Sequence, residues 1–167
     1  MATAVTPEAM KRALGRYPTG VTVVTTQGPE GPVGLTVNSF TSVSMDPPLI
    51  LWCLGSQSPN LEAFRASEYF AVNILAADQA ALCSHFAAPA TERFQGVDWW
   101  AGTGGVPLLK GVVARLVCRQ YRRDAGGDHE IFLGEVVEIE AAADDPLVYL
   151  AGGFRVAVDR RGSAATG

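Results

Sequence analysis

The segment from residue 21 to residue 38 contains Val21-Thr22-Val23-Val24-Thr25-Thr26, then Gln27-Gly28-Pro29-Glu30-Gly31-Pro32, then a second apolar run from Val33 to Asn38. β-Branched residues fill the first run, and they favour extended backbone because their side chains pack well on a pleated surface. Glycine and proline in the middle run are typical of a turn. The segment therefore predicts two strands that pair across a turn.

Further strands are expected along the chain, over residues 40–45, 49–54, 69–75, 112–120 and 129–140. In the segment 112–120 the even positions are apolar, while Arg115 and Arg119 face the other way, which indicates a half-buried strand. This strand should pair with 129–140 across a turn at 123–128. Many strands separated by turns predict a small, closed or nearly closed antiparallel barrel.

Helices are few in this sequence. Thr6 is a plausible N-cap with Pro7 at the first helical position, and apolar residues follow at helical spacing until Gly15 and the Tyr17-Pro18 step. A second helix is expected to begin at Ser58-Pro59-Asn60, and a third over 77–86. The segment 94–111 is rich in glycine and tryptophan and is expected to be a loop.

Length and composition indicate one globular domain. The chain has 167 residues, of which 48% are hydrophobic and 18% charged, so we expect a single domain over 1–167 with its core at about 9–158 and a tail at 159–167. The net charge of -4 and the lack of a basic run argue against nucleic acid. No signal-peptide pattern and no bilayer-length apolar run occur, which predicts a soluble cytoplasmic protein.

Several classes of site lack their sequence signatures. The three cysteines, Cys53, Cys83 and Cys118, are widely spaced among apolar residues, which is typical of reduced, buried thiols. With two histidines and no C-x-x-C pair, no metal site is expected. There is no P-loop, no dinucleotide-binding G-x-G-x-x-G after a strand and no G-x-S-x-G elbow.

Polar residues gather at the end of the second strand, from Thr36 to Ser42. One interpretation is an edge strand whose polar side chains face solvent. The alternation favours a second interpretation, because Thr36, Asn38 and Phe40 share one face and Leu35, Val37 and Ser39 the other. A polar row that runs toward a buried core fits a ligand with a polar edge.

Three further groups have two interpretations each. Ser56, Ser58 and Asn60 lie at the expected start of a helix, where free N–H groups favour an anion, but simple capping explains Ser58 equally well. Arg93 is either a phosphate ligand or a solvated charge. His129 follows Gly127-Asp128 at the start of a strand, and it is either a functional imidazole or a polar strand end.

Four motifs, taken together and in this order, resemble one protein family. They are Tyr17–Thr26, then Gly34–Phe40 with Pro47-Pro48-Leu49, then Phe70–Leu75, and finally Gly127-Asp128-His129 with Gly134-Glu135-Val136. The chain is similar in these motifs to the short-chain flavin reductases, the reductase components of two-component flavin-dependent monooxygenases. The resemblance covers about Ala9 to Val158.

The resemblance implies a fold, an activity and partners. The fold would be the FMN-binding split barrel, which is mainly β, antiparallel and Greek-key-like, with a few short helices. The protein would be a homodimer that reduces FMN or FAD with NADH or NADPH. Reduced flavin would then reach a flavin-dependent monooxygenase, either by transient contact or by diffusion.

The resemblance also implies site residues. Flavin-contacting positions would be Thr36, Val37, Asn38, Ser39, Phe40 and Ser42 at the ring and ribityl chain, Cys53 and Leu54 at the ring, Ser56, Ser58 and Asn60 at the phosphate, and Ser84, Phe86 and Arg93 elsewhere. His129 would be the histidine on the nicotinamide side, where Tyr149 and Gly152 touch the same ligand.

Two other functional classes fit part of the pattern. A non-catalytic flavin- or haem-binding barrel, acting as sensor or carrier, would not need His129. An oxidase of an amine or a phosphorylated vitamin would need more basic residues near a substrate phosphate. The sequence also leaves the nicotinamide nucleotide open, because Arg122 and Arg123 either meet a 2′-phosphate or form a solvated turn.

Overall fold

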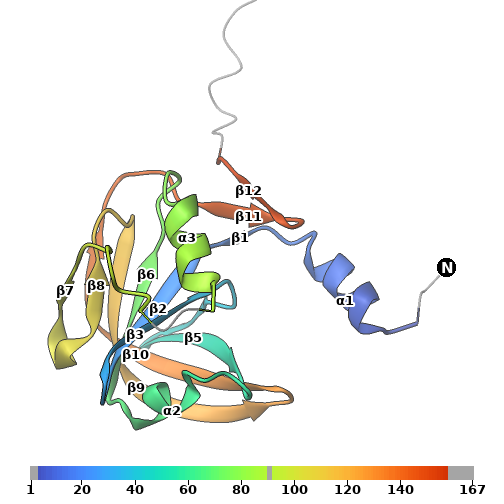
Figure 1. Ribbon diagram of the computed structural model, residues 1–167. Coiled ribbons are helices and arrows are strands. Elements are labelled where there is room, and N and C mark those ends of the chain that lie inside the picture. The colour runs from blue at the N-terminus through green and yellow to red at the C-terminus, as the bar shows by residue number, and fades with distance from the viewer. Residues whose placement is uncertain (1–3, 90–91, 158–167) are drawn as a thin grey trace, which may run out of the picture.

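The computed structural model describes residues 4–89 and 92–157, so the tail expected at 159–167 lies outside the described residues (Figure 1). In chain order the elements are α1 (Pro7–Leu14), β1 (Thr19–Gly20), β2 (Thr22–Gly28), β3 (Gly31–Val37), β4 (Thr41–Met45), β5 (Pro48–Gly55), α2 (Leu61–Ala66), β6 (Tyr69–Ile74), α3 (Ala80–Ala87), β7 (Trp99–Ala101), the 3-10 turn η1 (Thr103–Gly105), β8 (Pro107–Leu109), β9 (Ala114–Gly126), β10 (His129–Ala141), β11 (Val148–Leu150) and β12 (Gly153–Arg155). None of the described helices is long and apolar enough to span a bilayer.

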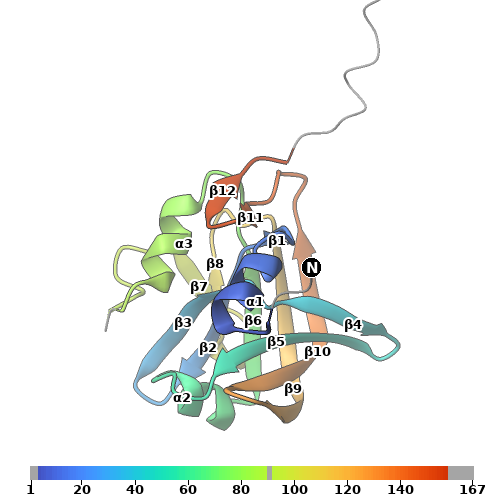
Figure 2. The ribbon, with the colours of Figure 1, turned by 90° about the vertical axis from the view of Figure 1, so that its right-hand side faces the viewer.

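A curled antiparallel sheet of seven strands forms the body of the molecule, in the order β3-β2-β6-β9-β10-β5-β4 (Figures 1 and 2). Its two edges, β3 and β4, are joined directly by residues 38–40, so the wall of the barrel is split at this crossover. The Ser39 hydroxyl holds the crossover to β5, since it accepts from the Cys53 N–H at 2.9 Å and donates to the Cys53 carbonyl at 3.2 Å. The predicted antiparallel split barrel is confirmed.

The hairpin β2–β3 is tighter than its sequence indicates. Gly28 pairs with Gly31, and Gln27 pairs with Pro32, so the turn consists of Pro29 and Glu30 alone. Gly31 has φ 135°, a conformation that side-chain-bearing residues rarely adopt. The strands predicted on both sides of this turn are present with the expected pairing.

Aromatic side chains fill the barrel. Trp52 stacks on Phe132 with ring centroids 4.7 Å apart, and it meets Phe64 and Phe70 edge-on at 4.9 and 5.8 Å. Each of the four is at most 1% exposed. Phe64 comes from α2, which lies at the lower end of the barrel in Figure 1. Burial of these rings anchors α2, β5, β6 and β10 to one another.

The expected loop at 94–111 is wrong in part, because it contains β7, η1 and β8. Strands of three residues are too short to show a periodic pattern, and they are fixed by distant polar groups. The buried Asn73 side chain accepts from the Leu109 N–H at 2.9 Å and donates to the Val23 carbonyl at 3.1 Å. The Thr25 hydroxyl donates to the Pro107 carbonyl at 2.6 Å.

Arg115 faces away from the barrel interior as expected, but it is 8% exposed rather than solvated. The β7–β8 hairpin covers this face, and the guanidinium lies 4.6 Å from the centroid of the Trp100 ring. Its Nε donates to the Leu109 carbonyl at 2.8 Å, and its Nη1 pairs with Glu140 at 2.9 Å. The buried charge is thus both hydrogen-bonded and ion-paired, as its burial requires.

The helices agree with the sequence in number but not in every boundary. In α1 the Thr6 hydroxyl accepts from the Ala9 N–H at 3.1 Å, which confirms the predicted cap. The second helix begins at Leu61 rather than at Pro59. The Ser58 hydroxyl accepts from the Asn60 N–H, so Ser58 stabilises a turn before the helix and does not cap the helix. The third begins at Ala80, because the Gln79 side chain accepts from the Ala76 N–H and holds the preceding turn.

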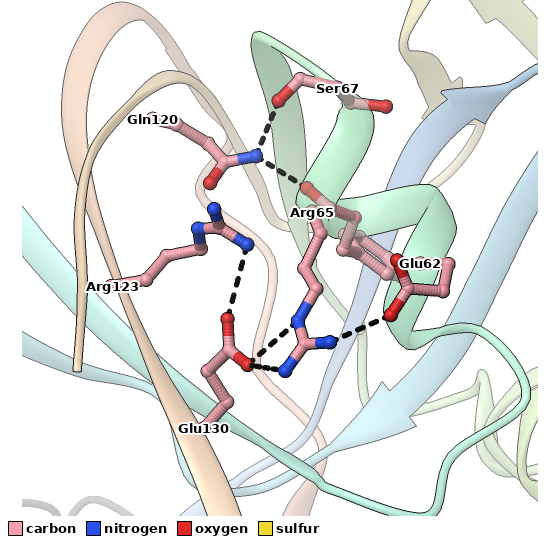
Figure 3. Close-up of polar contacts among 7 residues, drawn as sticks. Glu62, Arg65, Ser67, Gln120, Arg123 and Glu130 are labelled. Carbon is pink, nitrogen blue, oxygen red and sulfur yellow. Dashed lines mark hydrogen bonds and ion pairs between the residues drawn. The ribbon is translucent and has the colours of Figure 1, made fainter. Parts of the chain in front are cut away.

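Charged side chains fasten α2 to the β9–β10 hairpin (Figure 3). Arg65 donates to Oε2 of Glu130 through Nε at 2.9 Å and Nη2 at 2.6 Å, and to Glu62 through Nη1 at 2.7 Å. Arg123 Nη1 lies 3.3 Å from Oε1 of the same Glu130. The Gln120 amide donates to the carbonyls of Phe64 and Ser67 at the end of α2.

Glu130 should make stability depend on acid. The Arg65 guanidinium that binds it lowers the pKa of the Glu130 carboxyl below its ordinary 4.5. A lowered folded-state pKa stabilises the fold above the unfolded pKa, and this stabilisation is lost as pH falls through the folded value. We expect Glu130→Gln to unfold at lower urea concentration than wild type at neutral pH, and the difference to shrink as pH falls through the folded-state pKa of Glu130. A difference that persists in acid would contradict this.

Candidate functional site

Three surface cavities contain many of the side chains that the sequence singled out. The split cavity, of about 1060 Å³, lies at the crossover 38–41 and is flanked by the end of α1 and the β11–β12 turn. The Arg93 cavity, of about 870 Å³, lies between the β2–β3 turn, α2 and residues 92–95. The His129 cavity, of about 640 Å³, lies between α2 and the tip of the β9–β10 hairpin.

The split cavity combines flat apolar walls with polar groups. Asn38, Ser39 and Phe40 line it from the crossover, and Tyr149 and Gly152 line it from the β11–β12 turn. Its volume and its mixture of apolar and polar lining are typical of a site for a cofactor-sized ligand. Five of the residues carried over from the family are therefore brought together here.

The same cavity has features that the sequence analysis missed. The Thr19 hydroxyl lines it and is buried without a hydrogen-bond partner among the described residues. Lys11, Arg12 and Arg16, around the end of α1, add three positive charges to its lining. A buried hydroxyl without a partner and a cationic rim suit a polar, anionic ligand. The sequence signal for Thr19 is its position inside the first family motif, Tyr17–Thr26.

Several predicted flavin positions turn their side chains into the protein. The Thr36 hydroxyl donates to the Cys83 carbonyl at 2.7 Å, and this bond ties β3 to α3. Phe86 is completely buried, and Leu54 is 3% exposed. The expected alternation ends at Val37, where the chain leaves the strand, so Phe40 packs with Val37 against the barrel core instead of facing with Thr36.

The remaining assignments are spread over the surface of the barrel. The Ser84 hydroxyl donates to the Ala80 carbonyl of its own helix at 3.2 Å, and Ser42 is exposed on the edge strand β4. The predicted residues that line none of the three cavities are Thr36, Val37, Ser42, Cys53, Leu54, Ser58, Ser84 and Phe86.

The Arg93 cavity joins two residues that the family resemblance placed at a phosphate. Asn60 and Arg93 both line it. Arg93 donates through Nη1 to the Gly34 carbonyl at 2.9 Å, while its Nε is buried and has no partner among the described residues. A guanidinium with an unpaired N–H beside a cavity suits a phosphate, which accepts several charge-assisted hydrogen bonds.

His129 begins β10 opposite Gly55 of β5 and Gly126 of β9. Its Nδ1 lies 2.7 Å from the Asp128 carboxylate, so Nδ1 carries the proton and Nε2 is left as an acceptor when the ring is neutral. The hydrogen bond from His129 lowers the pKa of the Asp128 carboxyl. The Ser56 N–H donates to the Asp128 carbonyl at 2.9 Å and anchors the hairpin tip to the end of β5.

His129 and the other predicted nicotinamide residues lie in different cavities of one chain. Ser56 shares the His129 cavity, whereas Tyr149 and Gly152 line the split cavity. None of the three thiols lines either cavity. All are unpaired, and burial raises the pKa of each, that of Cys118 to about 12.

Residues 14–157 match the model of the flavin reductase like domain. The chain belongs to this family. It is 43% identical over 146 residues to the FMN reductase (NADH) SmoA of Agrobacterium fabrum, which covers 87% of this chain and 83% of SmoA. It is 34% identical over 154 residues to the flavin-dependent monooxygenase reductase subunit HsaB of Rhodococcus jostii, which covers 92% and 79% of the two chains.

A solved structure of the family has the same fold. The Streptomyces globisporus NADH:FAD oxidoreductase SgcE6, in complex with NAD and FAD fragments, superposes with a TM-score of 0.89 at 41% identity, covering 96% of this chain and 99% of that one. The family predicted from the four sequence motifs is confirmed. The individual site residues stay predictions.

Proposed function

We propose that this protein is an NAD(P)H-dependent flavin reductase, which transfers hydride to FMN or FAD and supplies reduced flavin to a monooxygenase. The observation that carries the proposal is the family match over residues 14–157. SmoA and SgcE6, which share more than 40% of their residues with this chain, are NADH-dependent reductases of FMN and FAD. The proposal includes a cytoplasmic location and a single domain.

The residues present fit a flavin. We place its ring system at the split cavity, where the buried Thr19 hydroxyl has no partner in the described part of the chain and Asn38 offers an amide. We place its phosphate at Arg93, whose buried Nε also has no partner there. β3 runs from the Arg93 cavity to the split cavity, and its seven residues span roughly 20 Å, so an extended FMN would follow this strand from phosphate to ring.

His129 would act on the nicotinamide. With Nδ1 held by Asp128, its Nε2 is the acceptor that would bind and orient the carboxamide N–H. When both cofactors are bound, they supply the hydride donor and the hydride acceptor. The protein's own part is to hold the two rings in contact and to exclude water between them. Because the split cavity and the His129 cavity lie apart in one chain, this contact would form where a second copy brings its His129 cavity to the split cavity.

The activity is tested by mixing purified protein with NADH and FMN or FAD and following the near-ultraviolet absorbance of the reduced nicotinamide. We expect rapid oxidation of NADH that requires both protein and added flavin. Absence of oxidation with either flavin, and with either NADH or NADPH, would refute the proposal. A non-catalytic flavin-binding barrel would bind flavin but give this negative result.

Arg93 provides a test of the phosphate position. We expect Arg93→Met to weaken FMN binding about tenfold or more, because a charge-assisted contact to phosphate is lost. Riboflavin, which has no phosphate, should bind wild type and Arg93→Met about equally. Fluorescence titration with both flavins measures this, and Arg119→Met, whose arginine pairs with Glu135 outside the cavities, is the control. If Arg93→Met weakens the binding of FMN and of riboflavin equally, Arg93 has a structural role through its hydrogen bond to the Gly34 carbonyl instead.

The proposal includes a homodimer. Helix α1 has no buried residue; its Met10 and Leu14 are 56% and 61% exposed, and Leu14 lines the split cavity. In Figure 1 this helix stands away from the barrel. A second copy that covers α1 would bury this apolar face and would add walls to a cavity that is open in one chain.

Sedimentation velocity tests the dimer. We expect twice the chain mass for wild type and a shift toward the monomer for Leu14→Glu, which places a charge in the covered face. Arg155→Glu, at an exposed position of β12, is the matched control. A monomer at all protein concentrations would contradict the proposal.

A second partner is a flavin-dependent monooxygenase that receives the reduced flavin. HsaB is the reductase subunit of such an enzyme. Since reduced flavin is small and diffuses quickly, delivery would not require a stable complex. The test couples this protein to a monooxygenase across a dialysis membrane, where continued product formation supports delivery by diffusion.

A further inference from the structure

One wall of the Arg93 cavity is a segment that belongs to no helix or strand. Residues 92–95 line the cavity, and a hydrogen bond from the Gln95 N–H to the Glu92 carbonyl, at 3.2 Å, closes a turn there. A short turn lacks the regular hydrogen bonds of a sheet or helix, so contacts with neighbouring elements set its position. Those contacts decide where the guanidinium of Arg93 lies.

Two contacts hold this turn through its side chains. The Phe94 ring meets the buried Phe86 ring of α3 edge-on, with centroids 5.2 Å apart, and it meets the Trp99 ring at 5.5 Å. The Arg93 side chain donates through Nη1 to the Gly34 carbonyl at 2.9 Å. Apolar packing is not directional, so the packing of Phe94 does not by itself set the direction of the Arg93 backbone.

His85 supplies a third contact, to the backbone of Arg93. Its Nε2 lies 2.6 Å from the Arg93 carbonyl oxygen. A carbonyl only accepts, so Nε2 carries the proton and donates it. His85 stands on α3, which is fixed to β3 because the Thr36 hydroxyl donates to the Cys83 carbonyl at 2.7 Å. The imidazole therefore joins the turn to a helix that is itself held in place.

Arg93 has a capacity for an anion that the arginines of β9 lack. Each of the four arginines of β9 lies within 3.3 Å of a carboxylate oxygen. In the part of the chain that the structure describes, Arg93 makes no ion pair, and its buried Nε has no hydrogen-bond partner. A guanidinium without a carboxylate partner favours a phosphate, which accepts charge-assisted hydrogen bonds.

We infer that His85 is a positioning residue for the flavin phosphate. Its Nε2–H holds the Arg93 carbonyl, and this keeps the guanidinium beside the cavity in the orientation that a phosphate would meet. The inference rests on the proposed function, which places that phosphate at Arg93. The described residues that line the Arg93 cavity do not include His85, so it acts through Arg93 and does not touch the ligand. A binding group that is held in place beforehand loses less conformational freedom when the ligand binds.

The first test compares FMN with riboflavin in His85→Leu, which removes the donor, and in His85→Gln, whose side-chain amide still donates. We expect His85→Leu to weaken FMN binding about fivefold, the contribution of one hydrogen bond, and to leave riboflavin binding within about twofold. His85→Gln should regain most of the lost FMN affinity. In steady-state kinetics the loss should appear in KM for FMN and not in kcat. His85 is exposed on α3, so neither change removes a buried side chain.

A double-mutant cycle separates positioning from a general effect on the fold. In Arg93→Met the guanidinium is already absent, so the addition of His85→Leu should not weaken FMN binding further. If His85→Leu weakens FMN binding by the same factor in both backgrounds, His85 does not act through Arg93 and the inference is overturned. An equal loss of FMN and riboflavin affinity, or no loss of either, overturns it too. His85→Ala replaces His85→Leu in each comparison if the leucine variant does not fold.

The failure of this inference is distinguishable from the failure of the proposed function. Flavin titrations need no nicotinamide nucleotide, so they decide the role of His85 even if wild type oxidises neither NADH nor NADPH. In that case the proposed reductase activity fails, while a loss of affinity for FMN alone in His85→Leu still supports the inference. Conversely, active wild type together with unchanged FMN binding in His85→Leu overturns the inference alone.

Discussion

Replacement of His129 by alanine is expected to raise KM for NADH about tenfold or more while it leaves the dissociation constant of flavin within about twofold. His129 lies in a cavity apart from the two that contain Asn38 and Arg93. If the nicotinamide binds beside His129 as proposed, loss of the imidazole would remove a contact to the nicotinamide and none to the flavin. Steady-state kinetics with varied NADH and a separate flavin titration measure the two effects.

The neighbour Asp128 refines this prediction. Asp128→Asn keeps the hydrogen-bonding shape but weakens its hold on Nδ1 of His129. We expect a smaller rise in KM than for His129→Ala, together with a mixture of ring tautomers in the nitrogen NMR spectrum of His129. If His129→Ala weakens flavin binding more than it raises KM for NADH, the imidazole belongs to the flavin site.

The strands were the most predictable part of this fold. The run from Val21 to Thr26 is β-branched and followed by a glycine- and proline-rich turn, so local preference and tertiary structure agree there. In β7 and β8 the local signal is absent, and their position depends on Asn73 and Thr25, which lie more than 30 residues earlier. Contacts of that kind are invisible to periodicity.

The sequence predicts a set of site residues but not where they lie in the fold. The motifs pointed to Asn38, Arg93 and His129, yet nothing in their spacing shows that one chain separates them into three cavities. Burial could not be predicted either. Phe86 matches a flavin-contacting position of the family, but the curl of β3 against α3 puts the Phe86 ring in the core. Thr19 escaped notice because only three-dimensional structure reveals a hydroxyl without a partner.

Replacement of Phe132 by alanine should destabilise the fold by about 3–5 kcal/mol, since a buried aromatic ring is lost and the surrounding rings cannot close the cavity. Phe132 is completely buried and contacts both Trp52 and Phe64. Urea unfolding followed by tryptophan fluorescence measures the change. A loss below about 1 kcal/mol would show that this cluster is not the centre of the barrel.

The comparison with His129 makes this test specific, because both residues lie on β10 and point to opposite faces of the sheet. Phe132→Leu keeps most of the apolar volume, so it should fold, lose less stability than Phe132→Ala and retain the wild-type KM for NADH. His129→Ala, half-exposed at the strand end, should keep wild-type stability and change KM. If Phe132→Leu or His129→Ala strongly changes both the stability and the KM for NADH, then strand β10 does not separate a packing face from a binding face.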